Sequence, residues 1–523
     1  MPTAANFARL NADQLRDMVH SQLVLIEGKD RLIEDKDREL LWRQAKIDKL
    51  TFELAQLKRA QFGHRSEQLP GEQAKLFDEA IAADLAAIEL EVSAEAEHLA
   101  AQGPENTPQA TPKATPKRAP LPAHLPRTDI HHEPEATVCA CGCQMKRIGE
   151  DVAEKLDYTP GVFTVERHIR GKWACGRCET LTQAAVPAHV IDKGIPTAQL
   201  LAHVLVAKFH DHLPLYRQEA IFARAGVAIA RSTLAQWVGQ CGVVLQPLVD
   251  ALQAEMLTHA VLHADETPVA MLKPGLGKTH RAYLWAYSTG AHDPMRAVVY
   301  QFADSRAGRH AEAFLGDWRG TLVCDDYAGY KHLLTKGVTE AGCMAHARRK
   351  FFELHATHKS TLAGEALGYF GELYGVEREA AALDAEARRQ MREERARPIA
   401  QALHDWLLGH RLKVTEGSAI ARAIDYSLKR WAALVRYLDD GWVPIDNNWI
   451  ENQIRPIALG RKNWLFAGSQ RAGERAAAVM SLIHSARLNG HDPMRYLADV
   501  LQRLPTQRMS AIGELLPHRW RGG

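Results

Sequence analysis

The 523-residue sequence lacks a long apolar run, a secretion signal and a substantial net charge. No stretch of about eighteen or more apolar residues is present, and the N-terminus has no basic-then-apolar pattern, so we expect neither a membrane span nor export. A cytoplasmic location follows as the expectation. The formal net charge of +2 does not exclude a nucleic-acid partner, because basic and acidic residues are segregated along the chain.

Cysteine is also scarce, and five of the eight cysteines lie together in the segments CACGC and WACGRC. In a cytoplasmic protein such crowding favours a metal site over disulfides. Two such segments about thirty residues apart can hold Zn²⁺ with four thiolates and stabilise a small β-rich module. The predicted ligands are Cys139, Cys175, Cys178 and either Cys141 or Cys143. His131 and His132 are less favoured substitutes.

Three acidic residues far apart in the sequence have distinctive surroundings. Asp265 and Asp325 each end an apolar run, in VLHADETPV and GTLVCDDYAGY, and Glu451 opens a helical pattern in IDNNWIENQIRPIALGRKNW. An isolated Asp after a strand is usually a turn residue. Here, however, AYLWAYST and AVVYQF are predicted strands, SRAGRHAEAFLGDW a helix and LVCDD a short buried strand.

The resulting order is three antiparallel strands, a helix, a strand ending in Asp, and much later a helix carrying Glu. Ribonuclease-H-like nucleases and transposases share this order. Two-metal phosphoryl transfer requires carboxylates that converge from different elements on two cations about 3.5–4 Å apart. We therefore expect an α/β multidomain protein with a ribonuclease-H-like catalytic core.

Longer motifs around these residues resemble the DDE transposases of insertion-sequence family sixty-six. The similar segments, from about position 62 to the C-terminal region, are HADETPV, DDYAGY, CMAHARRKFFE, IDNNWIEN, RPIALGRKNWLFAGS and AVMSLIHSARLNGHDPMRYL. The resemblance implies Asp265, Asp325 and Glu451 as the catalytic, magnesium-binding residues, with Asp326 as the nearest rival of Asp325. Mn²⁺ could replace Mg²⁺.

The same resemblance implies an enzyme of the bacterial cytoplasm, at the nucleoid, that cleaves the ends of a mobile element and joins them to target DNA. Its partners would be double-stranded terminal repeats, target DNA and accessory transposition proteins. Two alternatives fit the same residues. One is a zinc-containing DNA-binding regulator with an inert core, and the other is a nuclease without strand transfer.

A long N-terminal helix is predicted over residues 8 to 60. Its apolar residues recur every seven positions, as Val19, Ile26, Ile33, Leu40, Ile47 and Leu54, which favours a homo-oligomeric coiled coil. The alternative is a helix packed on its own chain, since Gly28 weakens a free-standing rod by up to about 1 kcal/mol. An acidic helix is predicted over residues 72–100, and the Pro-rich segment 103–127 is expected to be an extended linker.

Residues 196–250 are predicted to be helical, with a turn at Gly226 and a second helix from about Ser232. This pattern is typical of a helix-turn-helix, and the alternative is a helical pair packed beside the catalytic domain. The basic residues expected to contact DNA are Arg217, Arg224, Arg231, Arg348, Arg349, Lys350, Arg455, Arg461 and Lys462.

Several residues near the acidic motifs are given structural roles. Cys343 and His346 have metal-ligand spacing but lack a second pair nearby, so a packing Cys and a site-lining His are expected. Asn447 and Asn448 are expected to cap the helix that carries Glu451. Trp464 and Phe466 are expected in the core rather than stacked on a base. The segment that contains them, RKNWLFAG, begins with two basic residues.

The predicted domain order is a coiled-coil helix at 1–69, an acidic helix and linker at 70–128, a zinc-binding module at 129–190, a helical DNA-binding region at 191–255, the first part of the catalytic core at 256–360, a helical insertion at 361–440, the second part of the core at 441–487 and a C-terminal tail at 488–523.

Overall fold

The computed structural model describes residues 12–62, 71–100, 120–159, 161–191, 194–273 and 279–522. The chain forms two compact units, one of residues 1–66 with 87–117 and one of residues 67–86 with 118–523. Most of the predicted linker lies outside the described residues. No helix within the described ranges has the length and hydropathy needed to cross a bilayer.

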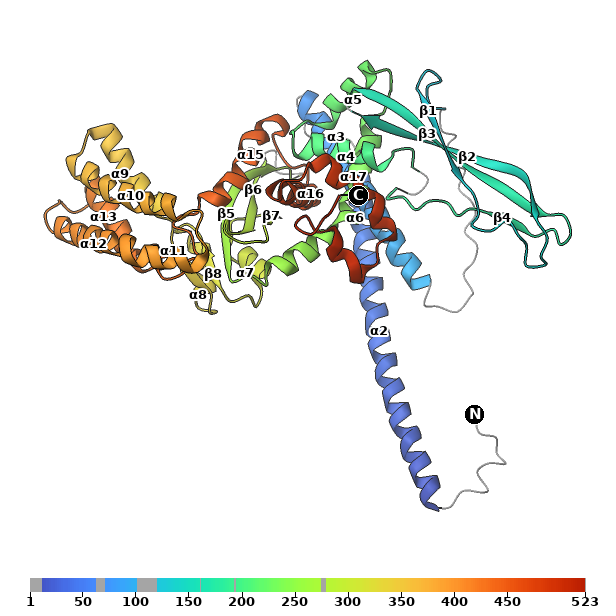
Figure 1. Ribbon diagram of the computed structural model, residues 1–523, viewed down its shortest axis with the longest axis horizontal. Helices are drawn as coiled ribbons and strands as arrows, with labels where there is room; N and C mark the ends of the chain where they lie inside the picture. The colour runs from blue at the N-terminus through green and yellow to red at the C-terminus, as the bar shows by residue number, and fades with distance from the viewer. Residues whose placement is uncertain are drawn as a thin grey trace. The chain divides into compact units, whose positions relative to one another are not determined.

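The smaller unit contains the helix α2 (Ala12–Phe62) and the second half of α3 (Gly71–Ala100) (Figure 1). Glu95 of α3 pairs with Arg43 and Lys46 of α2, with N–O distances of 2.8 and 2.5 Å. This part of α2 therefore packs on its own chain, in agreement with the alternative to a homo-oligomeric coiled coil. In the N-terminal part, the heptad residues Ile26, Ile33 and Leu40 are exposed in the single chain. This part of the seam is available for self-association.

The first half of α3 belongs to the larger unit and is fixed there by two buried acids. Glu79 pairs with Lys208 and accepts a hydrogen bond from the Leu215 N–H at 3.1 Å. Asp84, 1% exposed, accepts hydrogen bonds from Arg475 at 2.9 Å and from Ser469. Because buried carboxylates need partners, these contacts hold the helix in one position.

Replacing Asp84 by Ala is expected to lower the free energy of unfolding by about 3–5 kcal/mol, because Arg475 would stay buried without its carboxylate. Denaturant unfolding of the full chain measures the change. The control is Glu97→Ala on the same helix, at an exposed position, where a change within about 0.5 kcal/mol is expected. Equal effects of the two substitutions would contradict the role given to Asp84.

A four-stranded sheet forms the module that contains the cysteines. Its strands are β1 (Arg127–His132), β2 (Met145–Thr159), β3 (Val162–Cys175) and β4 (Leu181–Gln183). β2 and β3 form a long antiparallel hairpin, and β1 and β4 both pair with β3. The hairpin register sets Met145 opposite Cys175. The cysteine segments therefore lie together at the open end of this hairpin.

A five-stranded sheet forms the catalytic core, in the order β7-β6-β5-β8-β9. Its strands are β5 (Val261–Met271), β6 (His280–Thr289), β7 (Val298–Ala303), β8 (Thr321–Val323) and β9 (Thr339–Ala341). The first three are antiparallel, and β8 and β9 add in parallel after α7 (Arg309–Leu315). The predicted strand order of a ribonuclease-H-like core is confirmed.

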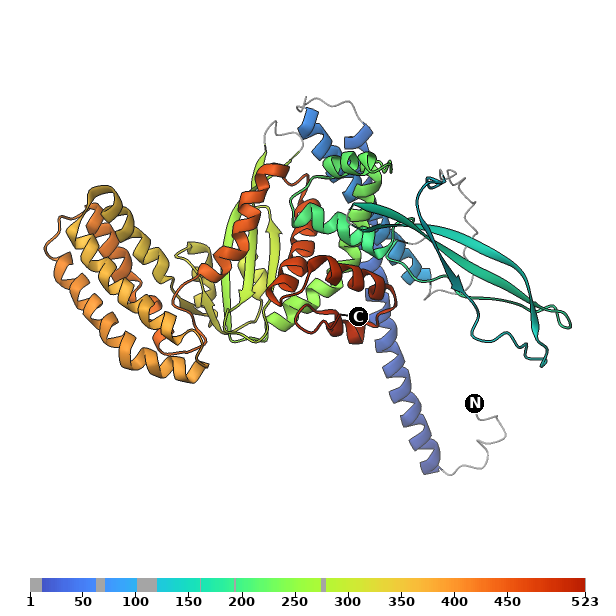
Figure 2. The same ribbon diagram turned by 45° about the horizontal axis from the view of Figure 1, so that its top comes forward.

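Two helices late in the chain pack on this sheet. α15 (Asn448–Trp464) crosses it over β5 and β6 (Figure 2). α16 (Gln470–Leu488) lies along the edge strand β7, whose N–H groups at Val298 and Tyr300 donate to the hydroxyls of Ser485 and Ser481 at 3.0 and 2.8 Å. The free edge is thus covered by side chains instead of another strand.

Helices before and after the sheet share its core. They are α4 (Ala198–Phe209), α5 (Leu215–Arg224), α6 (Arg231–Met256) and α17 (Pro493–Arg503). On α6, Leu234, Trp237 and Cys241 are buried, so one face of this helix packs in the core, whereas Ser232 and Gln236 near its start are exposed. The helix-turn-helix and the helical pair packed beside the catalytic domain therefore both stay predictions. Residues 488–523, expected to be a tail, contribute Tyr496 and Leu501 to the same core.

The helical insertion has a hydrophobic core of its own. Its main helices are α9 (Met344–His358), α10 (Thr361–Ala380), α11 (Ala385–Met391), α12 (Arg397–Arg411) and α13 (Ala419–Lys429). Phe351 of α9 packs in this core with Phe370 and Leu403, so the insertion begins structurally before the predicted residue 361. Arg392, fully buried, pairs with Glu377 at 2.7 Å.

Candidate active site and cysteine cluster

The first two predicted catalytic carboxylates lie on neighbouring strands. Asp265 is inside β5, and Asp325 lies two residues beyond the end of β8. The two strands pair in parallel, with His263 opposite Val323. Asp265 and Asp325 therefore each follow the last residue of this pairing by two positions, on adjacent strands.

The expectation that Asp265 ends its strand is wrong. β5 continues to Met271 because β6 pairs with it from Leu262 onward. The pairing with β8, however, stops at His263. Asp265 therefore lies beyond the point where β5 stops pairing with β8. This loss of pairing, rather than an end of β5, leaves room for the carboxylate.

Glu451 is in the first turn of α15, as predicted. The start of this helix is fixed to β5 by Asn447, which is 1% exposed. The Asn447 amide donates to the Ala264 carbonyl at 2.9 Å, and its oxygen lies 2.8 Å from Nδ1 of His263. Asn447 therefore ties the helix that carries Glu451 to the strand that carries Asp265.

The capping role expected of Asn447 and Asn448 is wrong. No side chain caps α15 at Asn447, and the Asn448 amide bonds to the carboxylate of Asp446 at 2.8 Å. Asp446 also accepts from the Asn448 N–H at 3.0 Å. Asn447 thus serves tertiary packing on β5, which local capping rules do not reveal, while Asp446 and Asn448 bond to each other.

The charges of the other two carboxylates act on Asp265. Burial and the charges of Glu266, Asp325 and Glu451 raise the pKa of Asp265 to about 8. The negative charge of Glu266 has its own partners, because its carboxylate accepts hydrogen bonds from Arg306 at 2.6 Å and from the Tyr330 hydroxyl at 2.8 Å. Repulsion among Asp265, Asp325 and Glu451 is what a bound divalent cation would relieve, and their oxygens are the ligands Mg²⁺ prefers.

Asp326 differs sharply from Asp325. Its carboxylate pairs with Arg430 and, at 3.3 Å, with Lys331. Asp325, by contrast, accepts a hydrogen bond from the Tyr327 N–H at 3.0 Å, which is a local contact. This difference favours Asp325 over Asp326 as a metal ligand.

Glu451 also has close neighbours on α9. Nδ1 of His346 lies 3.8 Å from its Oε1, and the Arg349 guanidinium lies 3.8 Å from its Oε2. One ligand atom each of Cys343, His346 and Glu451 lies within 4.8 Å of the others. Cys343 and His346 therefore have one further possible ligand, Glu451, from a distant part of the chain, and the burial of Cys343 and the position of His346 beside Glu451 agree with a packing Cys and a site-lining His.

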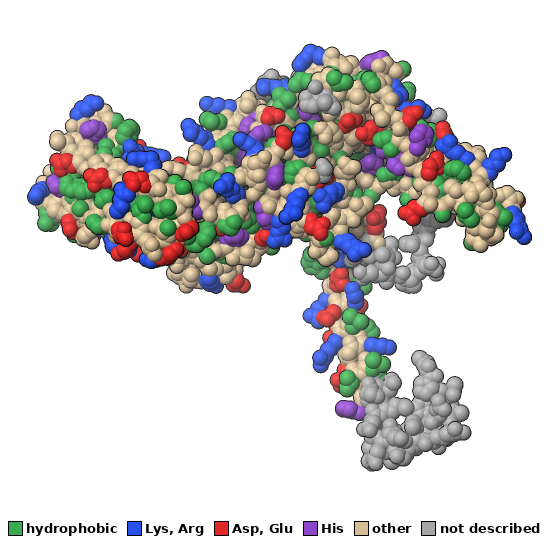
Figure 3. All heavy atoms as spheres, in the orientation of Figure 1, with side chains coloured by type: hydrophobic (Ala, Val, Ile, Leu, Met, Phe, Trp, Pro, Cys, Tyr) green, Lys and Arg blue, Asp and Glu red, His purple; other side chains and the backbone are tan. Residues whose placement is uncertain are grey.

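The basic residues expected to contact DNA have varied surroundings. Arg348, Arg349 and Lys350 are exposed at the start of α9, and Arg455 and Lys462 are exposed on α15. Lys and Arg side chains are visible where the helical insertion meets the sheet (Figure 3).

Another member of this set, Arg461, serves the fold by donating to the Pro268 carbonyl of β5. At Arg231 it is the backbone N–H that donates to Glu219, at 2.8 Å, and this contact assigns no role to the side chain. Arg217 and Arg224 are exposed on α5. Phe466 is buried and Trp464 packs against the main core, as expected.

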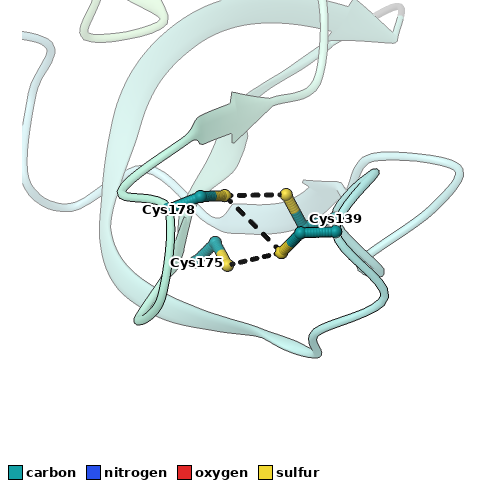
Figure 4. Close-up of side chains that lie close together, drawn as sticks. Cys139, Cys175 and Cys178 are labelled. Carbon is teal, nitrogen blue, oxygen red and sulfur yellow. Dashed lines mark hydrogen bonds between the residues drawn. The ribbon is translucent and has the colours of Figure 1, made fainter.

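Four cysteines form a compact cluster at the open end of the β2–β3 hairpin (Figure 4). The sulfur of Cys139 lies 3.0 Å from that of Cys178, and Cys141 lies 3.7 Å from both Cys175 and Cys178. Four thiolates at about 2.3 Å from a tetrahedral Zn²⁺ would be about 3.8 Å apart, so the cluster fits zinc.

The geometry of the cluster distinguishes the two candidates for the fourth zinc ligand, Cys141 and Cys143. Cys141 belongs to the group of four, whereas Cys143 does not. His132 lies 2.9 Å from His168 within the sheet, away from the sulfurs. Hydrogen bonds with Cys139 and Thr180 lower the pKa of Cys178 to about 6, which favours the thiolate form that binds metal.

Comparison with protein families matches four parts of the chain. Residues 193–475 match the family described as "Transposase IS66 family", and residues 136–179 match the "zinc-finger binding domain of transposase IS66". Residues 481–518 match the "IS66 C-terminal element", and residues 49–130 match "Transposase C of IS166 homeodomain".

Three similar proteins come from Sinorhizobium fredii (strain NBRC 101917 / NGR234). The chain is 39% identical to uncharacterized protein y4jD over 414 residues, which covers 76% of the chain and 80% of y4jD. It is 37% identical to y4hP, covering 74% of each, and 39% identical to y4qI, covering 71% of each. With the family match over more than half of its length, the chain belongs to the IS66 family of transposases.

Proposed function

We propose that the chain cleaves the ends of an insertion sequence and joins them to target DNA by metal-dependent phosphoryl transfer. Asp265, Asp325 and Glu451 would hold the catalytic ions. The main support is the arrangement of two adjacent strands and one helix that each carry a carboxylate, where burial and the neighbouring negative charges raise the pKa of Asp265 to about 8.

Mg²⁺ held by these residues would activate the attacking water or 3′ hydroxyl and stabilise the leaving 3′ oxygen. The role of the chain is to fix the carboxylates before substrate binds. Asn447 does so for Glu451 through its bonds to β5. No side chain needs to form a covalent intermediate with DNA.

The exposed basic residues beside the carboxylates would position the DNA backbone. Arg348, Arg349 and Lys350 begin α9, and Arg455 lies one helical turn beyond Glu451 on α15. Phosphate contacts of this kind orient a duplex without reading its sequence. Recognition of the terminal repeats is assigned to the zinc module and the α5 surface with Arg217 and Arg224.

A DNA assay tests the proposal. The substrate is a duplex that carries the inverted repeats flanking the gene, with Mg²⁺ or Mn²⁺ and the full-length protein. We expect cleavage at the repeat ends that exposes 3′ hydroxyls, and we expect pre-cut ends to join a target plasmid. Cleavage without joining would indicate a nuclease, and binding without cleavage a regulator; either result would overturn the proposal.

A further inference from the structure

Cys343, His346 and Glu451 form a second group of possible metal ligands, separate from the cysteine cluster. Cys343 precedes α9 and His346 lies in its first turn, so both face the same side of the helix. The Asn447 N–H donates to the Cys343 sulfur at 3.2 Å and joins the start of α15 to the start of α9. Glu451 is thereby held near both residues.

Two atoms of this group are buried without a hydrogen-bond partner among the described residues, Nδ1 of His346 and Oε1 of Glu451. They face each other at 3.8 Å, which is too long for a hydrogen bond. Such unpaired buried atoms are rare in folded proteins and call for an explanation. Nitrogen and oxygen ligands at about 2.1 Å from one tetrahedral ion would be about 3.4 Å apart, so a small movement of either side chain would let both hold the same ion.

We propose that Cys343, His346 and Glu451 bind a soft divalent ion such as Zn²⁺, and that this ion inhibits catalysis by withdrawing Glu451 from Asp265 and Asp325. The inhibition rests on the function proposed above, whereas the metal site does not. Glu451 would then belong to one of two ion sites at a time, the catalytic site for Mg²⁺ or the inhibitory site for zinc.

The ligand chemistry selects the ion. One sulfur, one imidazole nitrogen and one carboxylate oxygen are typical of zinc with one open position, whereas Mg²⁺ prefers oxygen alone. On binding, the Cys343 thiol releases its proton to solvent and becomes the thiolate ligand, with no change in oxidation state. Arg349 contacts the other carboxylate oxygen of Glu451 and leaves Oε1 for the ion.

Zinc content of the full-length protein tests the site directly. After equilibration with micromolar Zn²⁺ and removal of unbound metal, we expect about two zinc ions per chain, one at the cysteine cluster and one here. Cys343→Ser, His346→Ala and Glu451→Gln should each reduce the content to about one. The ion that remains at the cysteine cluster is the internal reference for the zinc content, and resistance of the catalytic core to limited proteolysis shows that each variant is folded.

Two control variants should keep the second zinc ion. Cys241→Ser removes a buried cysteine of α6 that lies outside the group, and Asp265→Asn removes a catalytic carboxylate without removing a ligand of this site. Equal zinc content in wild type and in the Cys343 and His346 variants would overturn the site. Loss of the second ion in Asp265→Asn would also overturn it, because zinc would then occupy the catalytic carboxylates.

Inhibition is measured separately, as the Zn²⁺ concentration that halves Mg²⁺-dependent DNA cleavage, with each protein compared with its own zinc-free rate. We expect this concentration to be at least about tenfold higher for Cys343→Ser than for wild type, because the inhibitory site loses a ligand. Equal zinc sensitivity would overturn the inhibition. If wild type cleaves no DNA, the proposed function fails while zinc content still decides the metal site.

Discussion

Replacing Asp265 by Asn is expected to reduce metal-dependent DNA cleavage and strand transfer by at least about 1,000-fold. Loss of one ligand charge removes several kcal/mol of transition-state stabilisation, and each 1.4 kcal/mol corresponds to about a factor of ten in rate. Asn has nearly the same shape as Asp. Because burial and neighbouring charges already disfavour the ionised form of Asp265, we expect the metal-free variant to be at least as stable as wild type.

The measurement pairs a cleavage assay with a gel-shift assay on the same terminal-repeat duplex. Cleavage should be lost while DNA affinity stays within about twofold, since phosphate contacts come from other residues. Unchanged cleavage by the Asp265 variant would remove it from the active site. Loss of affinity together with cleavage would indicate a misfolded protein or a role in DNA binding.

Asp325 and Asp326 provide a matched pair for the second carboxylate. Asp325→Asn should abolish cleavage like Asp265→Asn. Asp326→Asn should retain it, because the Asp326 carboxylate serves Arg430 and Lys331 and Arg430 keeps its contact with Glu340 at 2.5 Å. The opposite result would assign the metal to Asp326.

The catalytic sheet could be predicted because its signals are local. Apolar runs with alternating polarity gave the positions of β5 to β8, and their order indicated the ribonuclease-H-like core. The placement of Asp325 followed from the end of a short buried strand. The continuation of β5 beyond Asp265 could not be predicted, because it depends on pairing with β6 and not on the strand itself.

Other parts of the site depend on contacts between distant segments, which one sequence does not reveal. Asn447 reads as a helix cap, yet its amide bonds to β5, over 180 positions earlier in the chain. In the sequence, Cys343 and His346 have too few metal ligands nearby, because the third residue of their group, Glu451, lies beyond the insertion. The sequence pattern at 198–256 fits a DNA-binding motif and a packed helical pair equally well, and the buried face of α6 is compatible with both.

Replacing Cys175 by Ser is expected to remove zinc from the cysteine cluster and unfold the surrounding module. The core at this end of the hairpin is small, with Cys139, Met145 and Cys175 as its buried residues, and Trp173 packs against it. Structural zinc sites of this type supply about 10–16 kcal/mol of apparent binding free energy at neutral pH, so a small apolar core cannot replace the metal. The catalytic core has separate hydrophobic packing and should stay folded.

Metal analysis and limited proteolysis with mass spectrometry measure these effects. The variant should lose one zinc ion and become cleavable between residues 133 and 183, while fragments of the catalytic core stay resistant. Affinity for terminal-repeat DNA should fall by at least about tenfold if the module contacts the repeats, since such a loss corresponds to 1.4 kcal/mol. Cleavage of pre-bound, non-specific DNA should fall less.

Cys141→Ser and Cys143→Ser identify the fourth ligand. The sulfur of Cys141 lies 3.7 Å from those of Cys175 and Cys178, whereas Cys143 lies outside the group of four. Cys141→Ser should therefore behave like Cys175→Ser, and Cys143→Ser should keep its zinc and its resistance to protease. If Cys143→Ser loses the metal and Cys141→Ser keeps it, the loop that precedes β2 must rearrange on binding zinc, because only then could Cys143 replace Cys141 beside Cys175 and Cys178.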